Sequence, residues 1–285
     1  MEKEKIGFIG QGWIGKNYAD DFERRGFEVV RYSLEPEYLS NKSAIGLCDI
    51  VFIAVPTLTT PAGFDYSIVK EVVGLVGKGK TAVIKSTILP GTTEKLQETY
   101  PEIYVFHSPE FLAEKTASYD AAHPIRNIIG MPIDTDAYRA RAQRVLDILP
   151  DAPFKSICTA SEAELIKYSS NAFLFTKVVF VNLMYDLAQY LGADWEVVRA
   201  GLSADPRIGT SHMQPQDNSG HSKNIGRGAG GHCFIKDFAA LVDLYEELLP
   251  EDNEGIKVLK ALEKKNAKLL LKSGKDIDML ESVYG

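Results

Sequence analysis

The stretch FIGQGWIGKNYADDF, near the start of the chain, constrains the fold more than any other. It carries Gly10, Gly12 and Gly15 in the spacing G-x-G-x-x-G, directly after an apolar run and at the start of an amphipathic segment. In such a strand-turn-helix the first glycine permits a tight turn, the second admits a pyrophosphate, and the third lets helix and strand pack closely. We interpret the stretch as a dinucleotide-binding turn that also presents Trp13 and Ile14 to the cofactor. A tight turn without a ligand is the alternative.

Short apolar runs alternate with amphipathic segments through the first half of the chain. Alternation of this kind predicts a parallel sheet covered by helices on both faces. We therefore expect an α/β fold with a Rossmann-like, doubly wound parallel sheet. The expected strands are KIGFIG, FEVVRY, DIVFIAV, TAVIKST and IYVFHS, and the later runs NIIGM and FKSICTA could extend the same sheet.

The sequence changes character near residue 160. The stretch SEAELIKYSSNAFLFTKVVFVNLMYDLAQYLG has no proline, and its only glycine stands at its end. Ser161 and Glu164 predict a capping-box start, and Gly192 predicts a C-terminal stop. One long central helix, followed by further helical segments, indicates an all-helical domain. We predict a dinucleotide-binding domain at residues 1–160 and a helical central domain at residues 161–285.

Charge and cysteine content argue against several classes of function. The chain of 285 residues has a net charge of −7 and no block of basic residues, which argues against nucleic acid or an anionic membrane as the main partner. Three cysteines without framework spacing fit a reducing compartment. The N-terminus enters an apolar run without a signal-peptide pattern, and no apolar run is long enough to cross a bilayer. We therefore expect a cytoplasmic protein.

The end of the second expected strand, VVRYSLEPEY, bears on the choice of cofactor. An NAD site usually has Asp or Glu there, which holds the ribose hydroxyls. Here Ser33 stands at the expected place, with Arg31 before it and Glu35 after it. Ser33 beside Arg31 could tolerate a 2′-phosphate, whereas Glu35 could serve the ribose, and a solvated turn fits equally well. The residues leave NAD and NADP open.

The stretch GAGGHCFIKD places Cys233 in an expected glycine-rich bend with charged residues nearby. A thiol that fills a core gap needs no neighbouring glycines, whereas a nucleophile that must reach a substrate carbon would use them. The alternative is that an isolated cysteine is a small buried hydrophobe. His221, His232 and Cys233 lack a paired spacing such as C-x-x-C, so we expect no metal site.

Beyond the glycine turn, further stretches follow one another in a distinctive order: AVPTLTTPAGFDYSIV, IKSTILPGTTEKL, HSPEFLAEKTASYDAAHP, AELIKYSSNAFLFTKVVFVN, DPRIG and GGHCFIKD. Together they resemble the UDP-glucose/GDP-mannose dehydrogenase family from residue 5 to about residue 270. The resemblance implies that NAD oxidises the 6-hydroxyl of a UDP-glucose-like nucleotide sugar to a uronic acid, in two hydride transfers through a thioester. It also implies a place in polysaccharide biosynthesis and a homodimer formed through the long helix.

The resemblance assigns roles to the residues of these motifs. The implied catalytic residues are Cys233 as nucleophile, Lys167 and Asn171 as stabilisers of negative charge on the substrate oxygen, and Asp237, Glu110 and Thr87 in water activation or proton transfer. The implied cofactor contacts, besides the glycine turn, Ser33 and Glu35, are Thr57, Thr87, Glu114 and Lys236. The implied substrate contacts are Glu110, Phe111, Leu112, Lys167, Asn171, Gly230 and Arg207, the last across the dimer interface. Lys167 and Asn171 are four residues apart, hence on one face of the expected helix.

Two features depart from the family. Family enzymes continue into a second α/β domain that binds the nucleotide, and we expect this chain to lack it. The loop from 207 to 233 is longer than usual and carries the side chains His212, His221, Lys223 and Arg227, which we expect to meet a phosphate. A disordered insertion is the alternative. A two-electron β-hydroxyacid-type dehydrogenase, which needs no thiol, and a non-catalytic cofactor-binding remnant are the alternative functions.

Overall fold

The computed structural model describes residues 4–221 and 224–285, apart from the side chain of Glu114. The chain divides into two compact units. Unit 1 comprises the residues up to Leu58 together with Asp65–Lys167, and unit 2 comprises Thr59–Phe64 and Tyr168–Gly285. The assignment of a cofactor-binding domain to residues 1–160 and a dimerisation domain to residues 161–285 stays a prediction.

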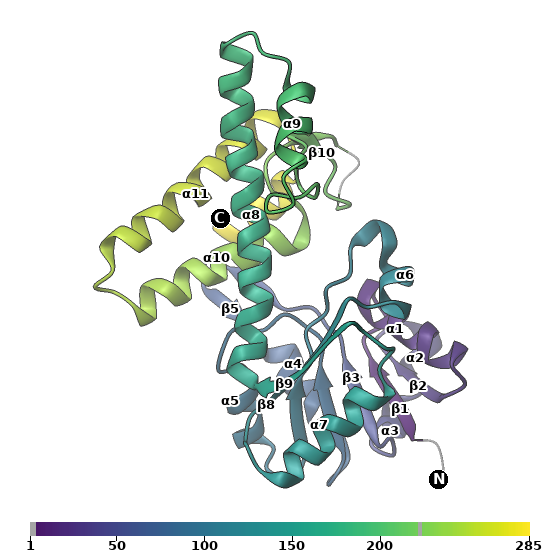
Figure 1. Ribbon diagram of the computed structural model, residues 1–285. Coiled ribbons are helices and arrows are strands. Elements are labelled where there is room, and N and C mark those ends of the chain that lie inside the picture. Colours follow the sequence, from purple (N-terminus) through teal and green to yellow (C-terminus); the bar gives the residue numbers. More distant parts are fainter. Residues whose placement is uncertain (1–3, 222–223) are drawn as a thin grey trace. The chain divides into compact units, whose positions relative to one another are not determined.

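Unit 1 is built on a seven-stranded sheet with the strand order β2-β1-β3-β6-β7-β8-β9. Its strands are β1 (Lys5–Ile9), β2 (Glu28–Tyr32), β3 (Ile50–Ile53), β6 (Thr81–Ile84), β7 (Tyr104–His107), β8 (Arg126–Met131) and β9 (Phe154–Thr159). Each strand coincides with a run that the sequence predicted as a strand, and the expected α/β, Rossmann-like class is confirmed (Figure 1). The pairing of β7 with β8 is antiparallel, whereas the other pairings are parallel.

Helices cover both faces of this sheet because its side chains alternate between them. Three helices share one apolar core with alternate residues of the strands: α1 (Trp13–Arg24), α6 (Ala117–Ala122) and α7 (Asp136–Ile148). In this core Phe8 stacks on Phe52, with ring centroids 5.1 Å apart. Contacts with β3 and β7 place α4 (Ser67–Val73) and α5 (Thr92–Thr99) against the sheet as well. The shorter segments of unit 1 are α2 (Pro36–Leu39), α3 (Lys42–Ile45) and η1 (Glu114–Thr116). The hairpin of β4 (Leu58–Thr60) and β5 (Gly63–Asp65) consists mainly of Thr59–Phe64, which belong to unit 2.

Unit 2 is mainly helical. The long helix α8 (Ala160–Tyr190) enters unit 2 at Tyr168 (Figure 1). The helices that follow it are α9 (Trp195–Ser203), α10 (Gly231–Leu248), α11 (Asn253–Ser273) and α12 (Ile277–Tyr284). Between α9 and α10, the short strands β10 (Gln216–Asp217) and β11 (Gly226–Arg227) pair with each other. Phe175 of α8 stacks on Phe238 of α10, with ring centroids 3.8 Å apart. No helix in the described part of the chain, α8 included, is both long and apolar enough to cross a bilayer.

The long helix begins at a different capping box from the predicted one. The amide of Glu162 donates to Oγ1 of Thr159 (3.3 Å), and the Glu162 carboxylate accepts from the Thr159 amide (2.8 Å). This reciprocal pair is the capping box, so the pairing of Ser161 with Glu164 was wrong. The Ser161 hydroxyl donates instead to Glu94 (2.9 Å). The predicted stop is confirmed, because Gly192 follows the helix with a φ of +67°.

Glu164 joins α8 to another helix of unit 1. Its carboxylate accepts from the amide of Gly91 (2.7 Å) and from the amide and hydroxyl of Thr93 (2.9 and 2.6 Å). Gly91 is the N-cap of α5, so a side chain of α8 takes up the free amides at the start of α5. The side chain of Glu164 therefore fixes the first turns of α8 against the sheet unit.

Candidate functional site

The glycine turn between β1 and α1 combines close packing with one open position. A Cβ on Gly10 would lie 2.1 Å from the carbonyl oxygen of Ala54, and Gly10 has a φ of +89°. A Cβ on Gly15 would lie 2.0 Å from the carbonyl oxygen of Gly10, so helix and strand meet there as predicted. A Cβ on Gly12 would meet nothing within 4 Å. The open side of the turn is at Gly12, where a ligand has room to approach the backbone.

The first turn of α1 is free to receive an anion. Gly12 is its N-cap, with no side-chain cap and no acidic residue in the first turn. The free amides and the positive end of the helix dipole favour a negatively charged group at such a start. Trp13 is the first residue of α1 and is 39% exposed, whereas Ile14 packs against the apolar core. The residues of this turn therefore fit the pyrophosphate of a dinucleotide.

The end of β2 lies beside this turn. The amide of Gly10 donates to the carbonyl of Tyr32 (2.8 Å), which joins β2 to the turn. The hydroxyl of Ser33 accepts from the amide of Glu35 (3.2 Å), and Glu35 is the N-cap of α2. Arg31 is bound by two carboxylates of α1, Asp20 and Glu23. The predicted ribose contacts thus occupy a turn that is held by its own hydrogen bonds.

Three predicted residues follow the carboxyl ends of neighbouring strands, where ligands collect in open α/β sheets. Thr57 follows β3, Thr87 follows β6 and Glu110 follows β7. The hydroxyl of Thr57 donates to the carbonyl of Thr87 (2.8 Å). The hydroxyl of Ser86 adds two bonds, from the amide and to the carbonyl of Val55. The loops after β3 and β6 are therefore tied together.

Glu110 and Lys167 form a buried ion pair within unit 1. Nζ of Lys167 donates to Oε1 and to the carbonyl oxygen of Glu110, each at 2.7 Å, and both side chains are almost fully buried. The second carboxylate oxygen of Glu110 accepts from the amide of Leu112 (2.8 Å). The ring centroid of Phe111 lies 5.5 Å from Nζ of Lys167 and 3.5 Å from the guanidinium carbon of Arg126. Four of the predicted residues thus meet in one cluster.

Lys85 is a buried cation that no motif in the sequence indicated. Its Nζ donates to the hydroxyl of Ser108 (3.0 Å) and lies 4.6 Å from the ring centroid of Tyr18. Burial lowers the pKa of Lys85 to about 7; the charge of Glu110 opposes this shift and that of Lys167 adds to it. The residue stands in the quoted run TAVIKST, but the strand pattern alone gave no sign that its amine is buried.

Cys233 lies in the first turn of α10, and not in the bend that the sequence predicted. The helix starts at Gly231, with Gly230 as its N-cap, and the thiol is exposed. Burial raises the pKa of each of the two other thiols, Cys48 and Cys158, to about 11. A helix start favours negative charge, which is the state in which a thiol is nucleophilic. The alternative that Cys233 fills a core gap is wrong.

Asp237 lies one turn beyond the thiol on the same helix. Its carboxylate accepts from Nδ2 of Asn171 (2.7 Å) and pairs with Nζ of Lys236 (2.5 Å), and only 2% of the residue is exposed. The bond to Asn171 joins α10 to α8 within unit 2. A carboxylate, an amide and an exposed thiol are therefore positioned by the packing of these two helices.

The glycines that precede the thiol are held by Lys275 and Asp276, which lie in the link between α11 and α12. A Cβ on Gly230 would lie 2.1 Å from Oδ2 of Asp276, and the same oxygen accepts from the amide of Gly231 (2.8 Å). Nζ of Lys275 donates to the carbonyl of Gly228 (2.9 Å). The sequence gave no signal for this support, because the contacts join residues far apart in the chain.

The other predicted residues are placed as follows. Arg207 is exposed and pairs with Asp205 (2.6 Å). In the loop before α10, Arg227 pairs with Asp186 (2.7 Å), so its charge is engaged by α8. The imidazole of His221 is hydrogen-bonded to His232 (2.8 Å) and to Asp278 (2.7 Å). The side chain of Glu114 and the whole of Lys223 lie outside the described residues.

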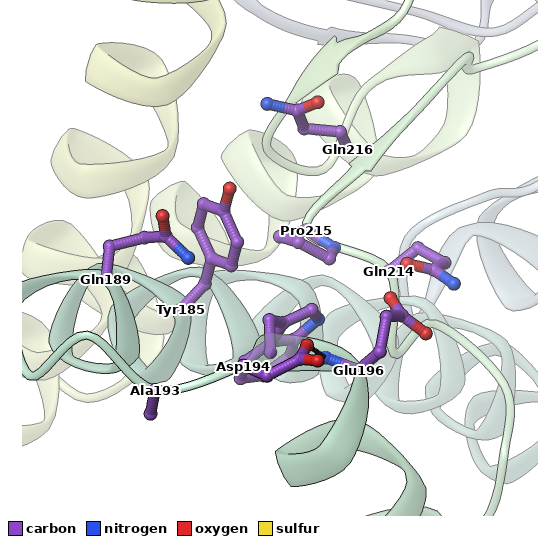
Figure 2. A pocket seen from close by; sticks show the side chains of 9 residues that line it. Tyr185, Gln189, Ala193, Asp194, Glu196, Gln214, Pro215 and Gln216 are labelled. Carbon is purple, nitrogen blue, oxygen red and sulfur yellow. Dashed lines mark hydrogen bonds between the residues drawn. The ribbon is translucent and has the colours of Figure 1, made fainter.

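Two cavities lie within unit 2. Figure 2 shows the first, of about 400 Å³, which is lined by Tyr185, Gln189, Ala193, Asp194, Trp195, Glu196, Gln214, Pro215 and Gln216. The second, of about 320 Å³, is mainly apolar and is lined by Phe173, Thr176, Lys177, Phe180, Val181, Met184, Trp195, Leu202, Arg207, Ile208 and Met213. Among the predicted site residues whose side chains the structure describes, only Arg207 lines one of these two cavities. In the described part of the chain, no three His, Cys, Asp or Glu side chains gather as a metal site.

Comparison with known proteins gives matches along most of the chain. Residues 37–147 match the NAD binding domain of the UDP-glucose/GDP-mannose dehydrogenase family, and residues 161–268 match the central domain of that family. A UDP-glucose 6-dehydrogenase of Rickettsia typhi is 33% identical over 267 residues, which are 89% of this chain and 58% of that protein. The chain spans about half the length of the curated relatives that it matches.

Solved structures agree in fold. A UDP-glucose dehydrogenase of Pyrobaculum islandicum has a TM-score of 0.78 at 29% identity, covering 94% of this chain and 68% of that one. A 3-hydroxyisobutyrate dehydrogenase of Mycobacterium tuberculosis has a TM-score of 0.69 at 15% identity, covering 99% of each chain. The second likeness concerns the fold alone.

Proposed function

Because the chain belongs to the UDP-glucose/GDP-mannose dehydrogenase family, we propose that it catalyses the NAD-dependent oxidation of a nucleotide-sugar alcohol to a carboxylate. The observation that carries this proposal is the exposed thiol of Cys233 in the first turn of α10, one turn before the buried carboxylate of Asp237 and its hydrogen bond from Asn171. A single hydride transfer needs no thiol, whereas oxidation from alcohol to acid uses one to hold the aldehyde.

The cofactor would be held by the glycine turn. NAD, when bound, accepts the hydride in each oxidation step. Gly12 leaves space beside the free amides of α1, which supports a pyrophosphate at this helix start. Thr57 and Thr87 lie on the neighbouring carboxyl ends of β3 and β6, which supports their proposed contact with the cofactor.

The thiol chemistry proceeds through bonds to sulfur. The first oxidation converts the alcohol to an aldehyde with loss of a hydride and a proton. The Cys233 thiolate then attacks the aldehyde carbon, forming a C–S bond, and the oxygen takes up a proton to give a thiohemiacetal. Loss of a second hydride and of that proton gives a thioester. Water then attacks the thioester carbon, the C–S bond breaks, and the acid and the free thiol are released.

The charged and amide side chains have roles consistent with their contacts. Lys167 and Asn171 would stabilise the negative charge that develops on the substrate oxygen. Asp237 and Glu110 would act on water or move a proton, Asp237 from its position beside Asn171 and Glu110 from its pair with Lys167. Thr87 would help to position water. Each of these roles is proposed residue by residue from the family motifs.

We further propose a cytoplasmic homodimer that forms through α8 and takes a UDP-glucose-like substrate for polysaccharide biosynthesis. Exposed apolar side chains on α8 support the dimer, since Phe173 and Phe180 are 69% and 54% exposed. Both line the apolar cavity that also includes Arg207. An exposed apolar surface of this kind is typical of a protein–protein contact.

The experiment that tests the function measures how much reduced cofactor forms per sugar consumed, with a panel of UDP- and GDP-sugars and with NAD or NADP. Two reduced cofactors per sugar, with turnover lost in Cys233→Ala and retained in the control Cys158→Ala, would support the proposal. One per sugar, with Cys233→Ala active, would favour a two-electron dehydrogenase instead. Cofactor binding without turnover on any sugar of the panel would favour a non-catalytic cofactor-binding protein.

A further inference from the structure

The guanidinium of Arg31 lies between α1 and the glycine turn. Its Nε donates to Oε1 of Glu23 (2.9 Å), and its Nη2 pairs with Oδ1 of Asp20 (2.7 Å) and Oε2 of Glu23 (2.7 Å). Its Nη1 donates to Oε1 of Gln11 (3.3 Å), a residue of the glycine turn. The side chain of Arg31 is only 11% exposed. Two carboxylates therefore hold this cation in place.

Arg31 is on the strand whose end meets the adenosine ribose in dinucleotide sites. It pairs in the sheet with Phe8 of β1, two residues before Gly10. An arginine in this region is the group that accommodates a 2′-phosphate, whereas an acid at the strand end selects the free 2′-hydroxyl. Ser33 stands where that acid is usual, so the end of β2 itself supplies no negative charge.

The charges around Arg31 disfavour a phosphate. One guanidinium and two carboxylates give the cluster of Arg31, Asp20 and Glu23 a net charge of −1 (+1 − 2). A phosphate monoester carries a charge of about −1.5 to −2 at neutral pH. It would have to compete with Asp20 and Glu23 for the donors of Arg31 and would be repelled by both. The same two acids thus occupy the donors and oppose the anion.

We propose that Asp20 and Glu23 are specificity determinants that withhold Arg31 from a 2′-phosphate and so make the site prefer NAD to NADP. This inference rests on the proposed function, since it requires that the glycine turn binds a dinucleotide. The preference for NAD over NADP would then come from these two carboxylates of α1, and not from an acid at the end of β2. The chain therefore holds a latent 2′-phosphate site that two side chains keep closed.

Calorimetric titration of NAD and of NADP into the wild type and into Asp20→Ala/Glu23→Ala tests the proposal. The double variant is expected to raise the affinity for NADP relative to NAD by about tenfold or more, because a charged hydrogen bond to phosphate becomes possible. Adding Arg31→Gln to the double variant should cancel the gain. The milder pair Asp20→Asn/Glu23→Gln should shift the ratio in the same direction, and thermal melts check that each variant is folded.

The matched control is Glu98→Ala/Glu102→Ala, which removes the same charge from exposed positions of unit 1, one in α5 and one just before β7. This control should leave the NADP to NAD ratio unchanged. An unchanged ratio in Asp20→Ala/Glu23→Ala, with NAD binding intact, overturns the inference and leaves the proposed function standing. The inference is also overturned if the gain in NADP affinity persists after Arg31→Gln is added, or if Glu98→Ala/Glu102→Ala shows the same gain. A folded wild type that binds neither cofactor overturns both.

Discussion

Two glycine-rich turns, each leading into a helix, have opposite surroundings. At the start of α1, Gly12 faces open space and the helix has no side-chain cap. At the start of α10, Gly230 has Asp276 and Lys275 within contact of a Cβ, and Asp276 takes up the amide of Gly231. Both turns are rich in glycine, but for different reasons. In the first, glycine leaves room for a ligand; in the second, glycine leaves room for the protein's own side chains.

This difference matches the roles proposed for the two helices. A helix start with free amides can bind an anion that comes from solution. At the start of α10 the amide of Gly231 already has a carboxylate partner, and this bond holds the first turn that carries Cys233. The surroundings of a glycine thus distinguish a binding turn from a supporting turn.

The largest expected effect is that of Gly230→Ala. Its Cβ would overlap the Asp276 carboxylate and force it away from the Gly231 amide, which should reduce the free energy of unfolding by about 3 kcal/mol. Denaturant unfolding in a Trp13→Phe background would report on unit 2 through Trp195. The double variant with Asp276→Ala should lose less stability than the two single variants together. Strict additivity would contradict the supposed contact.

The start of a third helix, α5, is also bound by a carboxylate, that of Glu164, and this contact should make the stability of the protein depend on pH. Burial raises the pKa of Glu164 from 4.5 to about 7, although the hydrogen bonds from Thr93 and Gly91 oppose the shift. A folded-state pKa above the unfolded value gives stability that is present below pH 4.5 and is lost as the pH rises towards 7. Glu164→Gln should therefore flatten the pH dependence of stability across this range, by roughly 2 kcal/mol.

The matched control for this prediction is Glu162→Gln, on the same turn of α8. Hydrogen bonds from Thr159 lower the pKa of Glu162, so its titration lies below that range. Its substitution should leave the slope between pH 4.5 and 7 as in the wild type. If Glu164→Gln keeps the wild-type slope, the carboxylate at the start of α5 is not the group that titrates there.

The smallest expected loss of stability is that of substitutions at the start of α8. Thr159→Ala removes the observed cap and should cost about 1 kcal/mol of stability, whereas Ser161→Ala removes one bond to Glu94 and should cost less. Thermal unfolding of the two variants side by side measures the difference. A larger loss in Ser161→Ala would show that the helix begins where the sequence predicted.

This helix start shows what local sequence can and cannot determine. Thr159 with Glu162 and Ser161 with Glu164 have the same spacing, so both satisfy the capping-box pattern. Only the fold decides between them, because Glu164 is drawn to the amides of Gly91 and Thr93. The strands followed from short apolar runs, and the long helix from a stretch without proline or internal glycine; both are features of neighbouring residues alone.

In the candidate site, too, some features were predictable from local sequence and others depend on the fold. The glycine turn was predictable because strand, turn and helix are consecutive, and Cys233 was identified by its motif. The motif did not reveal that the thiol lies within a helix, nor that Asp276 supports that helix from a distant part of the chain. Nor did it reveal the burial of Lys85, since the partner Ser108 stands on another strand's end. Contacts between distant residues are not encoded in spacing.

The most direct test of the contrast between the two turns is a calorimetric titration of NAD into the wild type, Gly12→Ala and Gly230→Ala, at a temperature where all three are folded. A Cβ on Gly12 meets no protein atom, so Gly12→Ala should keep the wild-type stability but bind NAD about tenfold more weakly or worse. Gly230→Ala should be less stable and bind NAD with the wild-type affinity. Equal affinity in Gly12→Ala and the wild type would contradict the claim that this turn is the open one.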